Sequence, residues 1–286
     1  MTALLRVDGL GVSYGRAHRA WAGLGRTTPP APTVSDVGFD LEDGAAVGIV
    51  GESGSGKSTT ARAIVGLLPF TGTVELDGVA LTSPRPREVR RRIQMVFQDP
   101  TSSLNPSIRC DRAVMQALPD RYPTTRVRRQ RAHELLEQVR LPSRSFGAWP
   151  SELSGGQRQR VAIARALATE PRLLIADEAT SALDVSVQAT ILDLFNLLRD
   201  ETGIGVVFIS HDLNVVRETC SQVLVMQHGR VVEQGLVEQI YEAPQHDYTR
   251  SLIAAVPTIE RSLERAAARA APREPEGRWL RADSDR

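Results

Sequence analysis

Residues 51–59 read Gly51-Glu52-Ser53-Gly54-Ser55-Gly56-Lys57-Ser58-Thr59 and stand between two segments of different character. Before them, residues 45–50 are apolar and partly β-branched, as in a buried strand. After them, Thr60 to Leu68 has a helical pattern, which Pro69 closes. A strand, a glycine-rich loop and a helix therefore follow one another, which is the local order of an α/β fold.

This order and spacing match the P-loop, a phosphate-binding loop. Glycines let backbone N–H groups curl around phosphate oxygens, the following helix adds its positive N-terminal end, and the Ser58 hydroxyl is available to Mg²⁺. An accidental glycine turn is disfavoured, because average amino-acid usage gives the pattern about a 1% chance in a chain of this length. The predicted ATP ligands of this segment are Gly51, Ser53, Gly54, Ser55, Gly56, Lys57, Ser58 and Thr59.

Lys57 is the only lysine in a chain with 35 basic residues, so all the others are arginines. An ammonium group is a compact point charge on a flexible stem, whereas a guanidinium group is a broad, planar fork. We interpret the single lysine as a requirement for a small cation between the β- and γ-phosphates.

A second buried strand is predicted at residues 173–178, and it ends in two carboxylates. Beside a P-loop, Asp177 is placed to hold Mg²⁺, directly or through water, and Glu178 to polarise the water that attacks the γ-phosphate. An acidic pair at a strand end is common and often has no function, but together with the P-loop it predicts a hydrolytic site.

Leu153-Ser154-Gly155-Gly156-Gln157 resembles the LSGGQ motif of ABC ATPases. We expect a helix from about Gln157 to Ala168, with exposed N–H groups and its positive end facing an anion. The resemblance implies that Ser154, Gly155, Gly156 and Gln157 contact the γ-phosphate of ATP bound to the opposite subunit of a dimer.

Further elements of that family follow in order, from Tyr14 to about Gln234. The resemblance implies that Tyr14 stacks on adenine, that Gln98 touches Mg²⁺ and the attacking water, and that His211 lies at the γ-phosphate. It also implies that Asp184 crosses the subunit interface. Lys57, Gln98, Glu178 and His211 are thus the predicted catalytic residues, and Ser58, Gln98 and Asp177 the predicted Mg²⁺ ligands.

The resemblance implies a P-loop NTPase (RecA-like) core with an ABC-type antiparallel β subdomain and an inserted α-helical subdomain. We expect an ATP-binding domain at residues 1–235, with the helical subdomain at about 100–168. A family-specific C-terminal extension at 236–258 and a flexible tail at 259–286 follow. The segment Arg16–Thr33, rich in Arg, Pro and Gly, is expected to be a hairpin loop.

A finer resemblance, to importers of oligopeptides, dipeptides or nickel, rests on three segments. They are residues 98–106, residues 182–188 and the stretch from Gln245 to Pro257, which lies outside the catalytic core. Two departures stand out: Ala179 takes the place of a proline, and residues 108–112 lack a Gly-Glu pair.

Composition argues against several other classes. Cys110 and Cys220 lack the spacing of a metal site, and the net charge of +1 gives no global attraction to nucleic acid. We expect neither a membrane span nor a signal peptide, because charge interrupts every apolar run. The arginine clusters at 85–92 and 126–131 leave a nucleic-acid-linked ABC ATPase as the alternative, disfavoured without a long coiled-coil insertion, zinc-binding cysteines or a second cassette. A P-loop kinase or GTPase does not explain LSGGQ.

The sequence therefore predicts the ATP-hydrolysing subunit of an ABC importer that takes up peptides, related small solutes or nickel. The expected cofactors are ATP and Mg²⁺. The expected partners are a second ABC ATP-binding subunit (a related chain or a second copy), two membrane permease subunits and, indirectly, a solute-binding protein, with no nucleic acid. The expected location is peripheral, on the cytoplasmic face of the membrane. The sequence does not name the transported solute.

Overall fold

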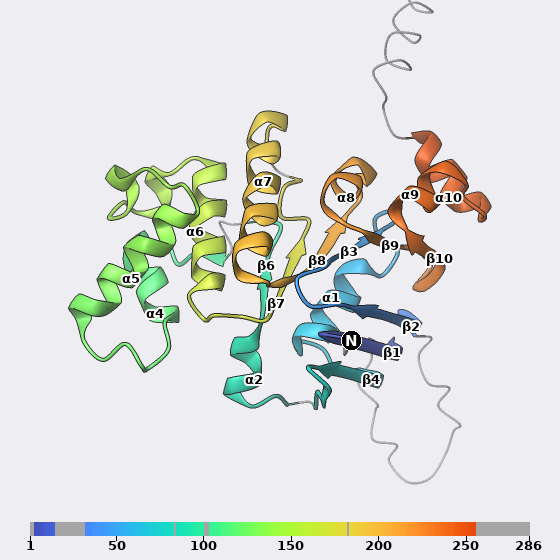
Figure 1. The fold of residues 1–286 in the computed structure, drawn as a ribbon, viewed down its shortest axis with the longest axis horizontal. Helices are drawn as coiled ribbons and strands as arrows, with labels where there is room; N and C mark the ends of the chain where they lie inside the picture. The colour runs from blue at the N-terminus through green and yellow to red at the C-terminus, as the bar shows by residue number, and fades with distance from the viewer. Residues whose placement is uncertain (1–2, 15–31, 83, 100–102, 182, 256–286) are drawn as a thin grey trace, which may run out of the picture.

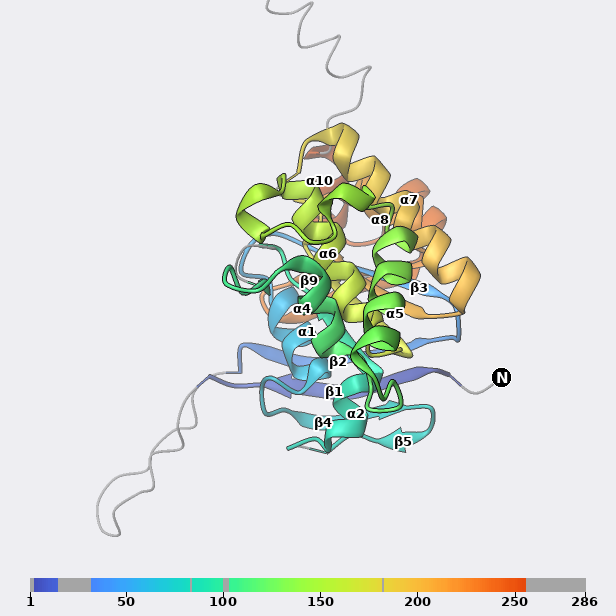
Figure 2. The same ribbon diagram turned by 90° about the vertical axis from the view of Figure 1, so that its left-hand side faces the viewer.

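Four strands from the N-terminal part of the chain form an antiparallel sheet in the order β2-β1-β4-β5. The computed structural model describes residues 3–14, 32–82, 84–99, 103–181 and 183–255 (Figure 1). The strands are β1 (Leu5–Val12), β2 (Val34–Leu41), β4 (Thr71–Leu76) and β5 (Val79–Ala80). Alternating burial along β1 and β2 directs their valines and leucines to the interior. This sheet lies at the bottom of Figure 2, below the helices that lie between residues 110 and 202.

A six-stranded sheet, in the order β10-β9-β3-β8-β7-β6, forms the centre of the molecule. Its strands are β3 (Ala46–Val50), β6 (Ile93–Val96), β7 (Leu173–Asp177), β8 (Gly205–Ser210), β9 (Gln222–Gln227) and β10 (Arg230–Leu236). All neighbours are parallel except β10, which pairs antiparallel with β9 at the edge. The carboxyl ends of β3, β7 and β8 therefore meet at one edge, where open α/β sheets bind ligands.

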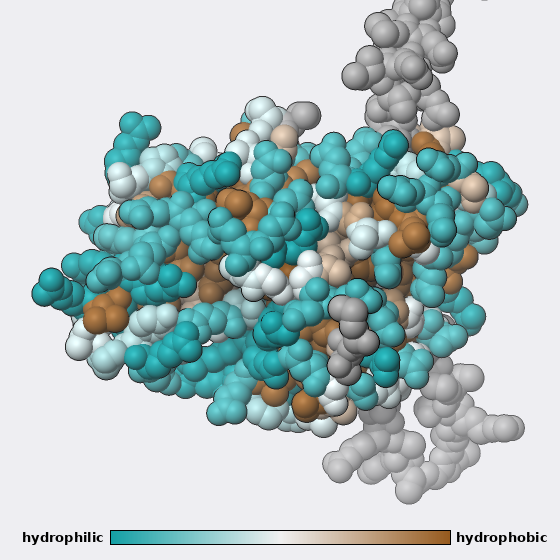
Figure 3. Space-filling model, in the orientation of Figure 1, coloured by the Kyte–Doolittle hydropathy of each residue, from teal (hydrophilic) through white to brown (hydrophobic). Residues whose placement is uncertain are grey.

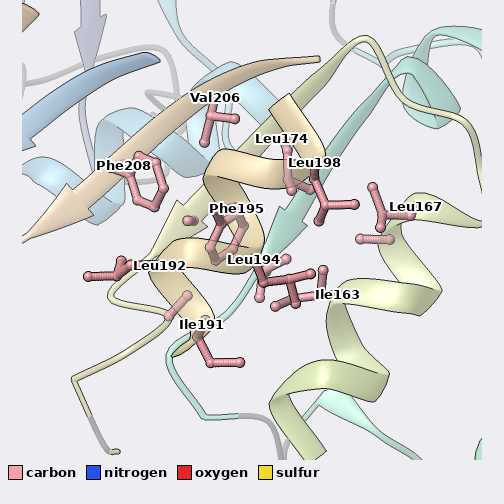
Figure 4. Close-up of a cluster of buried hydrophobic side chains, with 14 of the residues drawn as sticks. Ile163, Leu167, Leu174, Ile191, Leu192, Leu194, Phe195, Leu198, Val206 and Phe208 are labelled. Carbon is pink, nitrogen blue, oxygen red and sulfur yellow. The ribbon is translucent and has the colours of Figure 1, made fainter. Parts of the chain in front are cut away.

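Both faces of the six-stranded sheet are covered, which explains why β3, β7 and β8 are buried throughout. On β7, Leu173 and Ile175 join the core shared with α1 (Lys57–Val65) and the antiparallel sheet. Leu174 and Ala176 join the opposite core, with α7 (Val185–Thr202) and α8 (Leu213–Thr219). Figure 4 shows part of that second core. The rings of Phe195 and Phe208 meet edge to face there, with their centroids 5.2 Å apart.

A group of helices is inserted between β6 and β7, as expected for the helical subdomain. It contains α4 (Cys110–Ala117), α5 (Thr125–Gln138), short 3-10 helices at Ser143–Ser145 and Pro150–Glu152, and α6 (Gly155–Leu167). The small helix α2 (Arg87–Arg92) precedes β6. Burial raises the pKa of the Cys110 thiol to about 11, so this cysteine is a packing residue of α4.

The chain described after β10 forms two helices, α9 (Val237–Glu242) and α10 (Asp247–Ala255). They lie at the opposite end of the molecule from α4–α6 (Figure 1). Val237, Ile240 and Tyr248 are buried and belong to the larger core. The predicted extension therefore packs on the ATPase core, and its boundaries, like the other predicted domain limits, stay a prediction.

The α/β fold with two sheets and an inserted helical region is confirmed, but three predicted helix boundaries are wrong. The helix after the P-loop begins at Lys57, not at Thr60, and ends before Gly66, not at Leu68. It ends there because Gly66 adopts a left-handed φ of 88° and its N–H donates to the carbonyl oxygens of Arg62 and Ala63. The LSGGQ helix begins at Gly155, not at Gln157, because Ser154 caps it. The predicted hairpin at 16–33, except Pro32 and Thr33, and the tail from 256 lie outside the described residues.

In the part of the chain that the structure describes, no helix is long and apolar enough to cross a bilayer. The face shown in Figure 3 is mainly hydrophilic, with hydrophobic residues scattered between polar ones. Single exposed apolar residues of this kind are normal on a protein surface.

Candidate nucleotide site

The loop between β3 and α1 has a backbone that only its glycines can adopt without strain. Gly51, Gly54 and Gly56 have φ values of 149°, 81° and 107°. A Cβ on Gly51 would stand 2.2 Å from the Met226 carbonyl oxygen. The loop is therefore fixed against β9 before any ligand arrives, and its last residue, Gly56, is the N-cap of α1.

Lys57 lies across this loop. Its Nζ donates hydrogen bonds to the carbonyl oxygens of Gly51 and Glu52, both at 2.8 Å, and the residue is only 4% exposed. Burial lowers the pKa of Lys57, while the carboxylates of Glu178, Asp177 and Glu52 act in the opposite direction. The only lysine of the chain is thus buried and enclosed by the loop. Its place between the β- and γ-phosphates stays a prediction.

Ser58 and Asp177, predicted to hold Mg²⁺, lie in contact. The Ser58 hydroxyl donates to Asp177 Oδ1 at 2.7 Å, and Asp177 is 4% exposed at the end of β7. Burial raises the pKa of this carboxyl, although the Ser58 hydrogen bond lowers it. A carboxylate and a hydroxyl are the oxygen donors that Mg²⁺ prefers, so these two residues fit the ion.

Two of the predicted catalytic residues, Gln98 and His211, converge on a third, Glu178. Gln98 Nε2 donates to Glu178 Oε2 at 2.9 Å, and His211 Nδ1 lies 3.7 Å from Glu178 Oε1. These side chains follow β6, β7 and β8, which are neighbours in the sheet. Gln98 therefore faces Glu178, and among the residues that the structure describes no hydrogen bond joins Gln98 to Ser58 or Asp177.

The backbone of Glu178 is held in a left-handed conformation with a φ of 47°. Its N–H donates to the Ile209 carbonyl at 2.9 Å, and the following turn closes through the Ser181 N–H, which donates to the Glu178 carbonyl at 3.1 Å. A non-glycine residue at positive φ is uncommon and clusters at functional sites. The turn forms with Ala179 in the place of the family's proline.

Tyr14 stands at the entrance to α1. The residue is 50% exposed, and its hydroxyl lies 3.3 Å from the Thr59 hydroxyl. An exposed aromatic face beside the first turn of α1 is available for stacking on a base. The predicted adenine contact is thus adjacent to the loop, although the residues after Tyr14 lie outside the described chain.

The LSGGQ segment is a helix N-terminus closed by a capping box. Gln157 N donates to Ser154 Oγ at 3.3 Å, and Ser154 N donates to Gln157 Oε1 at 3.0 Å. A Cβ on Gly156 would stand 2.5 Å from Val187 Cγ1 of α7. Asp184, the residue predicted to cross the subunit interface, is the N-cap of α7. The two segments predicted to contact a partner subunit therefore lie at the N-termini of α6 and α7, which pack together.

Two residues that we did not predict touch the site. Ser181 Oγ accepts from Gln98 Nε2 at 3.2 Å and donates to the Glu178 carbonyl at 3.0 Å. Tyr248, from α10, accepts a hydrogen bond from the Glu52 N–H at 2.9 Å. The sequence offered a signal for Ser181, which lies three residues after Glu178, but none for the contact of Tyr248 with a loop 196 residues away.

The arrangement was compared with known proteins. Residues 34–181 match the ABC transporter family. A probable peptide ABC transporter ATP-binding protein of Sinorhizobium fredii is 46% identical over 260 residues, covering 89% of this chain and 73% of that protein. A peptidoglycan transport ATP-binding protein of Agrobacterium fabrum is 48% identical over 240 residues, covering 79% of this chain and 44% of that protein. This chain therefore spans less than half of the Agrobacterium protein.

A similar solved structure is a dimeric ATP-binding cassette in a post-hydrolysis state with ADP and phosphate bound. It is 32% identical to this chain with a TM-score of 0.69, and the match covers 82% of this chain and 98% of that one.

Proposed function

Because the chain belongs to the ABC transporter family as an ATP-hydrolysing subunit, we propose that it powers the import of peptides or related small solutes across the cytoplasmic membrane. The observation that supports this class of solute is that the two relatives described above are named for peptide and peptidoglycan transport. Nickel, the other cargo of importers that the sequence resembles, has no such support.

We propose that ATP binds with its phosphates in the loop of residues 51–59 and its adenine on Tyr14. Backbone N–H groups and the N-terminus of α1 then face the phosphate oxygens, and Lys57 exchanges its two loop carbonyls for the β- and γ-phosphates. Because Lys57 is already buried beside the loop, it needs little rearrangement to reach the phosphates.

Ser58 and Asp177 would hold Mg²⁺, and we propose Gln98 as a further ligand that turns from Glu178 when ATP binds. When bound, the ion neutralises charge on the phosphates. The buried Asp177 carboxylate, with its raised pKa, gains a compensating positive charge in that state.

Glu178 is the proposed general base. Its carboxylate is held between Gln98 and His211, and its strained backbone fixes the direction of the side chain. It accepts a proton from the water that attacks the γ-phosphate, while His211 and Gln98 position that water. The ends of β6, β7 and β8 thus bring together three side chains that act on the oxygen atom of the attacking water.

The second half of the site comes from a partner subunit. We propose that Ser154, Gly155, Gly156 and Gln157 of one chain face the γ-phosphate held by the other, with Asp184 crossing the interface. Support comes from the capped helix N-terminus of α6 and from the similar cassette that was solved as a dimer. The partner is a related ATP-binding chain or a second copy.

We further propose a peripheral position on the cytoplasmic face of the membrane, against two permease subunits that receive solute from a binding protein. The test is reconstitution of the transporter in liposomes with its solute-binding protein. Peptide-loaded binding protein is expected to raise the ATPase rate, and the Glu178→Gln variant should abolish that increase. Stimulation by Ni²⁺ and not by peptides would assign the transporter to nickel.

A further inference from the structure

The helix α10 reaches the nucleotide loop through a single hydrogen bond. The Glu52 N–H, in the loop, donates to the Tyr248 hydroxyl at 2.9 Å. The Tyr248 residue is 8% exposed and packs in the core that covers the six-stranded sheet. A segment outside the catalytic motifs thus contacts the backbone that cradles phosphate.

The position of Tyr248 is fixed by an ionised carboxylate on β10. Glu233 accepts hydrogen bonds from the N–H groups of Gln245 and His246, at 2.7 and 3.0 Å, just before α10 begins. Burial raises the pKa of Glu233, but its interactions with the Thr249 side chain and with the backbone amides of Gln245 and His246 outweigh this effect, so the pKa is lowered overall. A charged acceptor at a helix N-terminus is stabilising, so Glu233 tethers α10 to the sheet.

The same loop residue is held from its other side. The Glu52 carbonyl accepts from Lys57 Nζ at 2.8 Å, while its N–H is held by Tyr248. When Lys57 turns toward phosphate, it releases the Glu52 carbonyl. The contact with Tyr248 does not involve the ammonium group, so it can persist while Lys57 moves.

We propose that Tyr248 is a positioning residue for the nucleotide loop, and that docking of α10 sets the affinity of the chain for ATP. The hydroxyl fixes the peptide N–H at the entrance of the loop and so pre-orders the backbone donors that follow it. Pre-ordering of a binding loop raises affinity because less conformational entropy is lost on binding. The inference rests on the proposed ATP site in residues 51–59.

The decisive comparison is Tyr248→Phe against Tyr241→Phe. The Tyr241 hydroxyl, on α9, is buried and has no hydrogen-bond partner among the described residues, and the Arg217 guanidinium stacks on its ring at 5.2 Å. Both variants remove one buried hydroxyl and keep the ring. Only the first removes a contact with the loop.

Tyr248→Phe is expected to raise the Kd and KM for MgATP about three- to tenfold, the effect of one net hydrogen bond, with kcat nearly unchanged. Tyr241→Phe should leave Kd and KM at the wild-type values. Hydrogen exchange of the Glu52 amide, followed by NMR, should accelerate in Tyr248→Phe and not in Tyr241→Phe. Wild-type affinity and wild-type exchange in Tyr248→Phe would overturn the proposal.

A second pair of variants tests the tether itself. Glu233→Ala removes the two carboxylate oxygens that accept from the Gln245 and His246 amides, and it should weaken MgATP binding and speed Glu52 exchange as Tyr248→Phe does. Glu238→Ala changes an exposed carboxylate on α9 and should do neither. If Glu233→Ala left both readouts at the wild-type values, α10 would not be held by Glu233 as we infer.

Failure of this inference can be told apart from failure of the proposed ATP site by adding Lys57→Ala. If Lys57→Ala loses ATP binding while Tyr248→Phe binds normally, the site stands and the positioning role falls. If Lys57→Ala binds ATP normally, the proposed site itself is wrong.

Discussion

Lys57 is a residue whose chemical type, and not only its charge, is set by its surroundings. Its Nζ fits between two loop carbonyls at 2.8 Å, and the side chain is nearly fully buried. A guanidinium group is larger and planar, so it cannot occupy the same space without displacing the loop. We therefore expect Lys57→Arg to lose most ATP binding, measured by titration with a fluorescent ATP analogue. Normal affinity in that variant would show that charge alone is sufficient.

Glu178 is predicted to be needed for turnover and not for binding. Glu178→Gln keeps the size of the side chain but removes the group that accepts a proton from water. Steady-state phosphate release should therefore be abolished while ATP binding remains. Release at the wild-type rate would remove Glu178 from the role of general base.

Asp177 should make the stability of the nucleotide-free chain depend on pH. Burial raises its pKa above 3.8, so the folded state holds this proton more tightly than the unfolded state does. The folded state consequently loses stability as the pH rises from about 3.8 through the raised pKa. Asp177→Asn removes this loss and keeps an oxygen that can accept from Ser58. In urea unfolding at a series of pH values, the free energy of unfolding of Asp177→Asn should exceed that of wild type by an amount that grows with pH and then levels off. A difference that is the same at every pH would contradict this.

Most of the candidate site could be predicted from the sequence motifs. Binding of phosphate and Mg²⁺ strongly restricts which residue types can occupy the motif positions. The sequence could place Lys57, Asp177, Glu178 and His211 near one another, and the structure brings them to one sheet edge. It could not predict Tyr248, because a hydrogen bond between distant segments depends on how α10 packs, which no local pattern encodes.

At the scale of elements, α6 shows how a cap decides a boundary. The pattern Ser154-x-x-Gln157 is a capping box, and both of its hydrogen bonds form. A helix start at Gly155 therefore follows from local chemistry, and our expected start at about Gln157 was wrong. The strands expected at 45–50 and 173–178 were predicted more closely, since continuous apolar runs mark β3 and β7.

The two glycines at the start of α6 should respond differently to alanine. A Cβ on Gly156 would stand 2.5 Å from Val187 Cγ1, so the Val187 side chain or α7 must shift, which costs about 1–3 kcal/mol. A Cβ on Gly155 would meet Leu183 at 3.6 Å, an ordinary contact. Gly156→Ala should therefore lower the free energy of unfolding in urea, whereas Gly155→Ala should leave it unchanged or raise it. Equal effects would show that the close packing of α6 on α7 is not what requires Gly156.

At the scale of the whole molecule, the chain carries two half-sites on different helices. The phosphate loop precedes α1, which packs between the two sheets, whereas Ser154 opens α6 in the group with α4 and α5. Local sequence patterns identify each half but not how two chains align them. That alignment is a property of the assembled dimer.

The dimer itself can be tested with the Glu178→Gln chain, which is expected to bind ATP without hydrolysing it. Where the partner is a second copy, this chain with MgATP should elute at the mass of two chains in size exclusion with light scattering, and at the mass of one without nucleotide. Adding Ser154→Arg places a long side chain where the partner's γ-phosphate must approach the α6 N-terminus. The double variant should bind ATP with the affinity of Glu178→Gln and yet remain a monomer, because only its trans half is blocked. If it still dimerised with ATP, Ser154 would not face the partner's nucleotide.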